Sequence, residues 1–173
     1  MTSNRTILIT GVTAQQGGAV AQALKGTGFH LRGLTRKPDS ERAAALARHG
    51  IDVVKGDLDD EASLRRALAG VWGVFGVQNA AEADVEREET QGKRLATLAR
   101  EAGVEHYVYT SVGSAHKRTG VPHFDNKWRI EETVRGLRTA RSCFVYLKDR
   151  GSEIYLERGA HPRYPLSRMA GNL

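Results

Sequence analysis

The chain lacks three features that would each point to a particular class of protein. Cys143 is the only cysteine among 173 residues, so no internal disulfide can form, and a cytoplasmic location is favoured. No apolar run approaches the ~20 residues that a membrane-spanning helix needs. The first residues lead directly into a strand-like run, without a signal-peptide pattern. These absences predict a cytoplasmic domain with no membrane partner.

Patterns for three common chemistries are also missing. The six histidines are dispersed and the cysteine is alone, so no metal-ligand spacing arises and no metal site is predicted. No tyrosine precedes a lysine by four positions, so the usual proton donor of carbonyl reductases is not evident. Neither basic–aromatic interleaving nor a helix-turn-helix pattern is present. Direct binding of nucleic acid is therefore not expected.

The positive charge is concentrated near the end of the chain. The net charge is +6, from 26 basic and 20 acidic side chains. Residues 138–173 hold seven basic and three acidic side chains, so +4 of the total lies there. A basic balance can indicate nucleic acid or lipid partners, but the rest of the chain is nearly neutral, as expected of a metabolic domain.

Strand-like and helix-like segments alternate along most of the chain. This alternation predicts an α/β fold, a doubly wound parallel sheet of the Rossmann type with right-handed connections. We predict one domain over 1–147, followed by an irregular tail over 148–173, where neither period is visible. The predicted strands are 5–10, 29–35, 51–55, 71–77, 105–110 and 142–147, and the predicted helices are 17–25, 40–49, 61–69, 83–102 and 122–135.

The first predicted strand runs into a turn with the spacing G-x-x-A-x-x-G. Gly11 lets the backbone turn sharply, the small Ala14 lets it approach phosphates, and Gly17 lets the next helix pack close to the strand. The N–H groups and dipole of that helix face an anion. The alternative is an ordinary glycine-rich turn that binds nothing. The residues predicted to bind a dinucleotide pyrophosphate are Gly11, Thr13, Ala14, Gln15, Gln16 and Gly17.

Two basic residues, Arg36 and Lys37, follow the second predicted strand. In domains that prefer NAD, an acidic residue about 20 positions past the glycine turn binds the ribose 2′-hydroxyl. Here Arg36 stands nineteen positions after Gly17, and a guanidinium pairs with a 2′-phosphate that a carboxylate would repel. The pattern favours NADP(H) over NAD(H), with a solvated basic turn as the alternative.

The loop after the third predicted strand holds three aspartates. It belongs at the carboxyl edge of the sheet, where an adenine would lie. We expect Asp57 to accept a hydrogen bond from the adenine amino group, or Leu58 to pack on the ring. The alternative is that Asp59 or Asp60 simply caps the next helix, and for Asp60 this interpretation is favoured.

Three further residues are candidates for the nicotinamide end. Asn79 ends the fourth predicted strand near the switch point of the sheet, where the nicotinamide ribose would pass. Ser111 ends the fifth, where a hydroxyl could polarise a carbonyl substrate, or it is merely a turn residue. Lys127, in the first turn of the last clear helix, would hold ribose hydroxyls unless that turn is simply solvated. Ser111 and Lys127 are the candidate catalytic residues.

Six segments together resemble a known family. They are TGVTAQQGGAVA (10–21), TRKP (35–38), VVKGDLDD (53–60), ETQGKRLA (89–96), HYVYTSV (106–112) and HFDNK (123–127). In this order, and over roughly residues 5–137, the chain resembles the NmrA-like, HSCARG-type members of the atypical short-chain dehydrogenase/reductase superfamily. The chain departs from that pattern in Ala14, which replaces a glycine, in its length, and in the sequence after residue 137.

The resemblance implies a Rossmann fold that binds NADP(H). It implies that the turn from Gly11 to Gly17 holds the pyrophosphate, that Arg36 holds the 2′-phosphate and that Lys127 approaches the nicotinamide ribose. Many members of the family resemble redox sensors that regulate a protein partner, which could here be a second copy in a homodimer, with weak or no catalysis. Related branches reduce quinones or small carbonyl compounds. A third hypothesis, a truncated remnant of the family fold, predicts exposed apolar surface.

Overall fold

The computed structural model describes residues 5–78, 84–113, 115–117, 120–136, 141–147 and 154–158. Residues 117, 141–147 and 154–158 are described by their backbone alone. Asn79, one of the predicted cofactor-binding residues, lies outside the described residues.

Seven strands form one sheet in the order β3-β2-β1-β4-β5-β6-β7. Neighbouring strands are parallel from β3 to β6, and β7 pairs antiparallel with β6. The strands are β1 (Thr6–Ile9), β2 (His30–Thr35), β3 (Asp52–Lys55), β4 (Val71–Gly76), β5 (His106–Val112), β6 (Arg141–Leu147) and β7 (Ile154–Arg158). The helices are α1 (Gln15–Leu24), α2 (Glu41–Arg48), α3 (Glu61–Leu68), α4 (Val85–Glu101) and α5 (Pro122–Gly136), with a short 3₁₀ turn at Ala115–Lys117.

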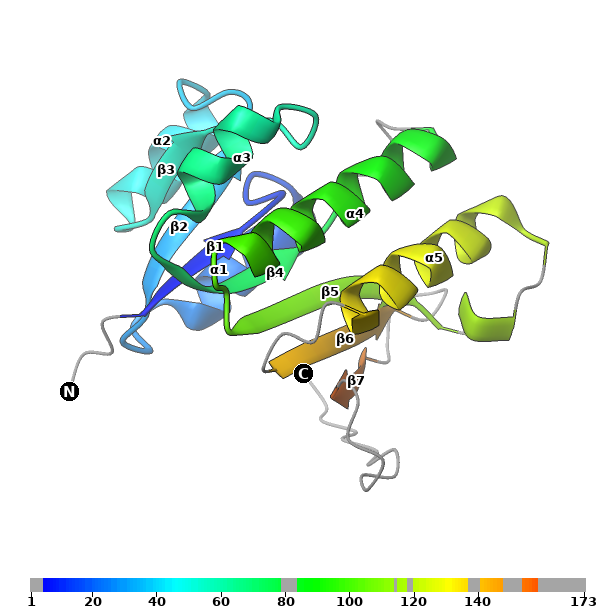
Figure 1. Cartoon of the computed structure of the whole chain (residues 1–173). Coiled ribbons are helices and arrows are strands. Elements are labelled where there is room, and N and C mark those ends of the chain that lie inside the picture. Colours follow the sequence, from blue (N-terminus) through cyan, green and yellow to red (C-terminus); the bar gives the residue numbers. More distant parts are fainter. Residues whose placement is uncertain are drawn as a thin grey trace.

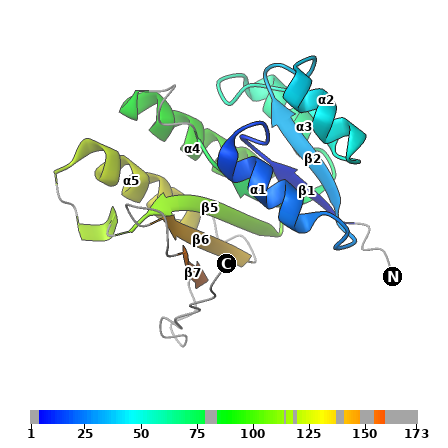
Figure 2. The ribbon, with the colours of Figure 1, turned by 180° about the vertical axis from the view of Figure 1, so that it is seen from behind.

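The helices cover both faces of the sheet, as the alternating sequence predicts. Helices α3, α4 and α5 lie on one face (Figure 1) and α1 and α2 on the other (Figure 2). Each face has its own core: Leu8, Leu64, Leu95 and Ile130 belong to the first, and Ile9 to the second. Because successive strand residues point to opposite faces, neighbouring apolar residues of β1 serve both cores. The predicted α/β doubly wound fold is confirmed.

The order of the strands creates a switch point between β1 and β4. The chain leaves β1 toward β2 on one side, while β4 pairs with the other side of β1. The hydroxyl of Thr10 bridges the two strand ends: it donates to the carbonyl of Val77 and accepts from the N–H of Val77, both at 2.8 Å. Ligands of open α/β sheets bind in the crevice at such a point.

Two sequence-based predictions differ from the structure. Helix α1 begins at Gln15, two residues before the predicted start at Gly17. The tail predicted to be irregular contains β7, which pairs with β6 from Cys143↔Arg158 to Leu147↔Ile154. Pairing with a neighbouring strand supplies backbone hydrogen bonds that no local periodicity reveals.

Two findings concern exposed hydrophobic residues and membrane-spanning helices. Among the residues whose side chains the structure describes, Val121 is the one exposed large hydrophobic residue, so the remnant hypothesis finds no exposed apolar patch among them. None of the helices described in the structure combines the length and the hydropathy that crossing a bilayer requires.

Candidate functional site

A hollow of about 340 Å³ lies at the carboxyl ends of the central strands. The segments after β1, β2, β3 and β4 each contribute to its wall, and α4 closes one side. The lining residues are Thr10, Gly11, Thr13, Ala14, Leu34, Thr35, Arg36, Lys37, Ser40, Arg42, Gly56, Asp57, Leu58, Val77, Arg87 and Gln91.

The glycine turn borders the hollow at the switch point. Gly11 has a φ of +58°, a conformation that other residues adopt only at a cost. A Cβ on Gly17 would collide with the carbonyl groups of Thr10 and Gly11, so only glycine lets α1 approach β1 this closely. The amide of Ala14 donates to the carbonyl of Gly11 at 2.9 Å, which closes the turn.

The first turn of α1 differs from those of the next three helices. Ser40, Asp60 and Asp84 each place a side-chain oxygen on a backbone N–H at the start of α2, α3 and α4. The residue in the same position before α1 is Ala14, whose side chain makes no such bond. The N–H groups at the start of α1 therefore remain available beside the hollow, where an anion would satisfy them. The predicted capping by Ser40 and Asp60 is confirmed.

Basic side chains line the hollow beside the glycine turn. Arg36, Lys37 and Arg42 line it and are exposed. The guanidinium of Arg42 donates to the carbonyl of Thr13 at 3.3 Å, which connects α2 to the glycine turn. Arg36 also lines an adjoining hollow, together with Lys55 and Arg66. The only carboxylate among the lining residues of the main hollow is Asp57, so the electrostatics favour an anionic ligand.

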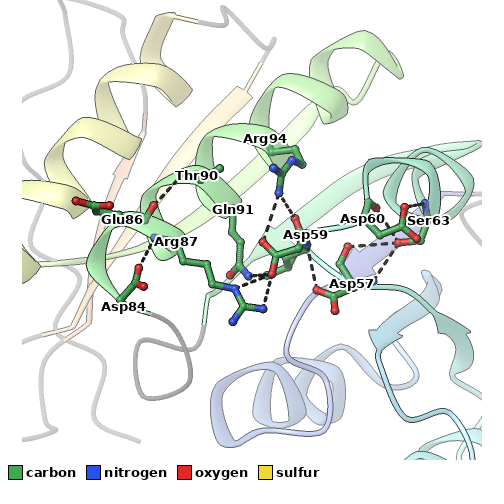
Figure 3. A network of polar contacts seen from close by, with 11 residues as sticks. Asp57, Asp59, Asp60, Ser63, Asp84, Glu86, Arg87, Thr90, Gln91 and Arg94 are labelled. Atoms are coloured by element: carbon green, nitrogen blue, oxygen red, sulfur yellow. Dashed lines mark hydrogen bonds and ion pairs between the residues drawn. The ribbon is translucent and has the colours of Figure 1, made fainter.

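Four residues form what we call the Asp59 cluster: Asp59, Arg87, Gln91 and Arg94 (Figure 3). The carboxylate of Asp59 accepts from Arg87 Nε at 2.7 Å and from Gln91 Nε2 at 2.9 Å, and Arg94 Nη1 lies 3.5 Å away. Burial opposes ionisation of Asp59, but the hydrogen bonds from Arg87 and Gln91 and the charges of Arg87 and Arg94 outweigh it, so its pKa lies below its ordinary value. The cluster joins α4 to the loop after β3.

Lys127 is held between α5 and α4. Its Nζ lies 2.6 Å from Glu88 Oε1, 3.4 Å from the carbonyl of Thr110 and 5.3 Å from the ring centre of Tyr109. Asn126 Nδ2 donates to the other oxygen of Glu88 at 2.9 Å. All these side chains are buried. The alternative of a solvated first turn is therefore wrong for Lys127.

Ser111 is also buried, and its hydroxyl donates to Glu131 Oε1 at 2.5 Å.

Two tyrosines of β5 are buried, and one of them, Tyr109, lies beside Lys127. Burial raises the pKa of Tyr107, and burial together with the charge of Glu88 raises the pKa of Tyr109 well above its ordinary value. Both phenols therefore stay protonated in the physiological pH range.

The structure brings together only part of the predicted set of site residues. Seven of them line the hollow: Gly11, Thr13, Ala14, Arg36, Lys37, Asp57 and Leu58. Three others form the first turn of α1 and are not among the lining residues: Gln15, Gln16 and Gly17. The two candidate catalytic residues also lie outside the lining of the hollow, where β5, α4 and α5 meet: Ser111 and Lys127.

Nine lining residues were not predicted as site residues, and three of them bring long polar side chains to the hollow: Arg42, Arg87 and Gln91. Arg87, Gln91 and Arg94 are spaced four and three apart, so they share one face of α4. That spacing is the signal that could have found the helical side of the site.

Comparisons with known proteins place the chain in a family. The model of the NmrA-like family matches residues 3–170. The chain belongs to the NmrA-like family. The match extends well past residue 137, where the resemblance was expected to end.

One relative of this NmrA-like chain is an NmrA-like family domain-containing protein of Dictyostelium discoideum. It is 30% identical over 148 residues, which cover 82% of this chain and 49% of that protein. The chain spans about half the length, or less, of the curated relatives that it matches.

Solved structures of two proteins are similar in fold. One is NmrA, a negative transcriptional regulator, in complex with NADP, with a TM-score of 0.72 and 25% identity over 83% of this chain and 45% of NmrA. NmrA has also been solved with NAD. The other is an NADPH-dependent quinone oxidoreductase of Escherichia coli in complex with NADPH, with a TM-score of 0.65 and 28% identity over 82% of this chain and 47% of that protein.

Proposed function

We propose that this NmrA-like chain binds a nicotinamide dinucleotide in the hollow, prefers NADP(H) to NAD(H), and acts in the cytoplasm as the cofactor-binding part of a redox-sensing regulator. One observation carries the proposal: the glycine turn at the uncapped start of α1 and three basic side chains, two just after β2 and one in α2, border the same hollow. A dinucleotide with a 2′-phosphate carries anionic groups suited to both the turn and the basic side chains. The NADP and NAD complexes of NmrA support the ligand class.

Within this proposal each part of the chain has a separate task. The turn from Gly11 to Ala14 and the first N–H groups of α1 bind the pyrophosphate. Arg36 and Arg42 bind the 2′-phosphate, since a guanidinium forms two parallel hydrogen bonds to a phosphate. We assign Lys127, which Glu88 holds outside the lining of the hollow, to the nicotinamide ribose, as the family resemblance implies. The nicotinamide ring would supply or accept a hydride if a reaction follows.

Calorimetric titration with NADPH and NADH tests the proposal. We expect NADPH to bind at least about tenfold more tightly, a difference of about 1.4 kcal/mol. Arg36→Ala should remove most of that preference. Arg65→Ala is the matched control, because Arg65 is an exposed α3 arginine paired with Glu61 and Glu101 and lines neither hollow. Equal affinities would contradict the NADP preference, and no binding of either would contradict the dinucleotide site.

The second candidate function is NADPH-dependent reduction of quinones or small carbonyl compounds. The likeness to the quinone oxidoreductase favours it. It predicts oxidation of NADPH by a panel of quinones, lost in Lys127→Ala and Ser111→Ala and retained in Glu89→Gln. Absence of turnover with every acceptor would contradict it.

Assembly with a protein partner or as a homodimer is tested by sedimentation of the chain with NADP and with NADPH.

A further inference from the structure

Part of the hollow lies outside the sites proposed for the pyrophosphate and the 2′-phosphate. The glycine turn and the neighbouring Arg36 and Arg42 border one part of the hollow. Asp57 and Leu58 from the loop after β3, together with Arg87 and Gln91 from α4, line another part. If the hollow binds a dinucleotide as proposed, this region faces the purine base. The inference below rests on that proposed function.

Gln91 is the neutral polar side chain on the α4 side of this region. Its Nε2 donates to the carboxylate of Asp59 at 2.9 Å, and the residue is 7% exposed. A carboxylate accepts hydrogen bonds and donates none, so it fixes which end of the amide faces it. The carbonyl oxygen of Gln91 must then face away from Asp59. Among the described residues, no donor contacts that oxygen.

Asp59 is itself held firmly in place. Arg87 binds its carboxylate through Nε and Nη2, at 2.7 and 2.5 Å. Arg94 adds a second cation at 3.5 Å and donates to the carbonyl of Leu58 at 2.8 Å. The backbone of Asp59 donates to Asp57 Oδ1 at 3.0 Å, so one oxygen of Asp57 is already occupied. Figure 3 shows these side chains converging on Asp59 from α4 and from the loop.

We propose that Gln91 reads the 6-amino group of adenine and that Asp59 is the positioning residue that orients its amide. Adenine carries a hydrogen-bond donor at this position, which the amide oxygen of Gln91 accepts. Hypoxanthine carries a carbonyl oxygen there, which would face the amide oxygen and leave both acceptors without a donor. A site built around one hydrogen-bonding group discriminates strongly against an analogue that lacks it.

The test compares NADPH with its hypoxanthine analogue, nicotinamide hypoxanthine dinucleotide phosphate, on the full chain. The two ligands differ only at C6, which carries an amino group or a carbonyl oxygen, and at the adjoining N1, which is protonated in hypoxanthine. The ratio of their dissociation constants is therefore insensitive to a general loss of stability. We expect wild type to prefer NADPH by about tenfold, the value of one good hydrogen bond. Gln91→Met removes the acceptor and should bring the ratio close to one.

Asp59→Asn tests the positioning role separately. An asparagine amide both donates and accepts, so Gln91 could turn its amide either way, and the ratio should fall although Gln91 is intact. Glu61→Gln is the matched control, since Glu61 pairs with Arg65 on the adjacent helix and does not line the hollow. It should keep the wild-type ratio.

Three results would overturn the inference. An unchanged ratio in Gln91→Met means that Gln91 does not read the base. If the preference for NADPH is lost in Asp57→Asn but kept in Gln91→Met, then Asp57 and not Gln91 accepts the hydrogen bond from the amino group. A ratio kept in Asp59→Asn removes the positioning role. Failure of wild type to bind either ligand overturns the proposed dinucleotide site as well, and so is distinct from the first three.

Discussion

The Nζ of Lys127 lies 2.6 Å from Oε1 of Glu88, and both side chains are almost completely buried. The pair connects α5 to α4, and Asn126 donates to the second oxygen of Glu88. A buried ion pair gains little net stability over apolar packing, but the loss of one partner leaves an uncompensated charge. The pair therefore constrains which substitutions the α4–α5 contact tolerates.

The first prediction follows from that asymmetry. Glu88→Gln should lower the free energy of unfolding by about 3–5 kcal/mol, because the ammonium of Lys127 would stay buried without its partner. Glu88→Gln combined with Lys127→Met should recover a large part of the loss. Urea denaturation measures both. Glu89→Gln is the control: it breaks a more exposed pair with Arg129 between the same helices and should cost about 1 kcal/mol or less. Equal costs for the two single variants would contradict the prediction.

The second prediction concerns Gly17. Gly17→Ala should weaken NADPH binding at least tenfold and lower the melting temperature, because the new Cβ would push α1 away from the carbonyl of Gly11. Gly136→Ala, at the end of α5 with open space around its Cα, should leave both unchanged. Calorimetry and thermal melting provide the two measurements. Unaltered binding in Gly17→Ala would show that the turn has room for a methyl group.

The third prediction concerns Ser111. Ser111→Ala should cost about 1–3 kcal/mol of stability, because Glu131 Oε1 loses a hydrogen-bond donor in a buried position. Thr133→Ala removes an exposed hydroxyl from α5 that donates to the carbonyl of Arg129, and should cost less than about 0.5 kcal/mol. Denaturation midpoints compare the two. If the losses are similar, the Ser111–Glu131 contact contributes nothing specific.

The fourth prediction is a pH dependence that belongs to Asp59. Its folded-state pKa lies below the ordinary value of about 3.9. The carboxylate therefore stabilises the fold above about pH 4, and this contribution is lost as the pH falls through the lowered pKa. Between about pH 5 and pH 3, wild type should lose more stability than Asp59→Asn. Urea midpoints at several pH values measure the difference. Identical slopes for the two proteins would refute the assignment.

The parts of the site that follow one strand directly could be predicted from the sequence. Gly11 and Gly17 are read from their spacing because the turn and the helix packing are local. Arg36 and Asp57 are found in the same way, as each lies just past the end of a predicted strand. Such positions depend on the fold class alone, which the alternation of strands and helices indicates clearly.

The parts that depend on distant pairing could not be predicted. Asp59 meets Arg87 across 28 positions and Gln91 across 32, and no local pattern links a loop aspartate to one face of a later helix. For Lys127, the sequence leaves a ribose contact and a solvated first turn as alternatives, and it does not indicate that Glu88 of α4 lies against the lysine. The strand β7 forms because β6 offers it an edge, which sequence periodicity does not record.

Helix α4 carries both polar systems on adjacent residues. Arg87 faces the loop after β3, and Glu88, the next residue, faces Lys127 on α5. Successive residues of a helix point about 100° apart, so these contacts lie on different sides of one rigid rod. A small rotation or shift of α4 caused by a base in the hollow would move the Glu88 carboxylate by a similar amount. The mechanical link between the adenosine half and the nicotinamide half of the proposed site is therefore α4 itself.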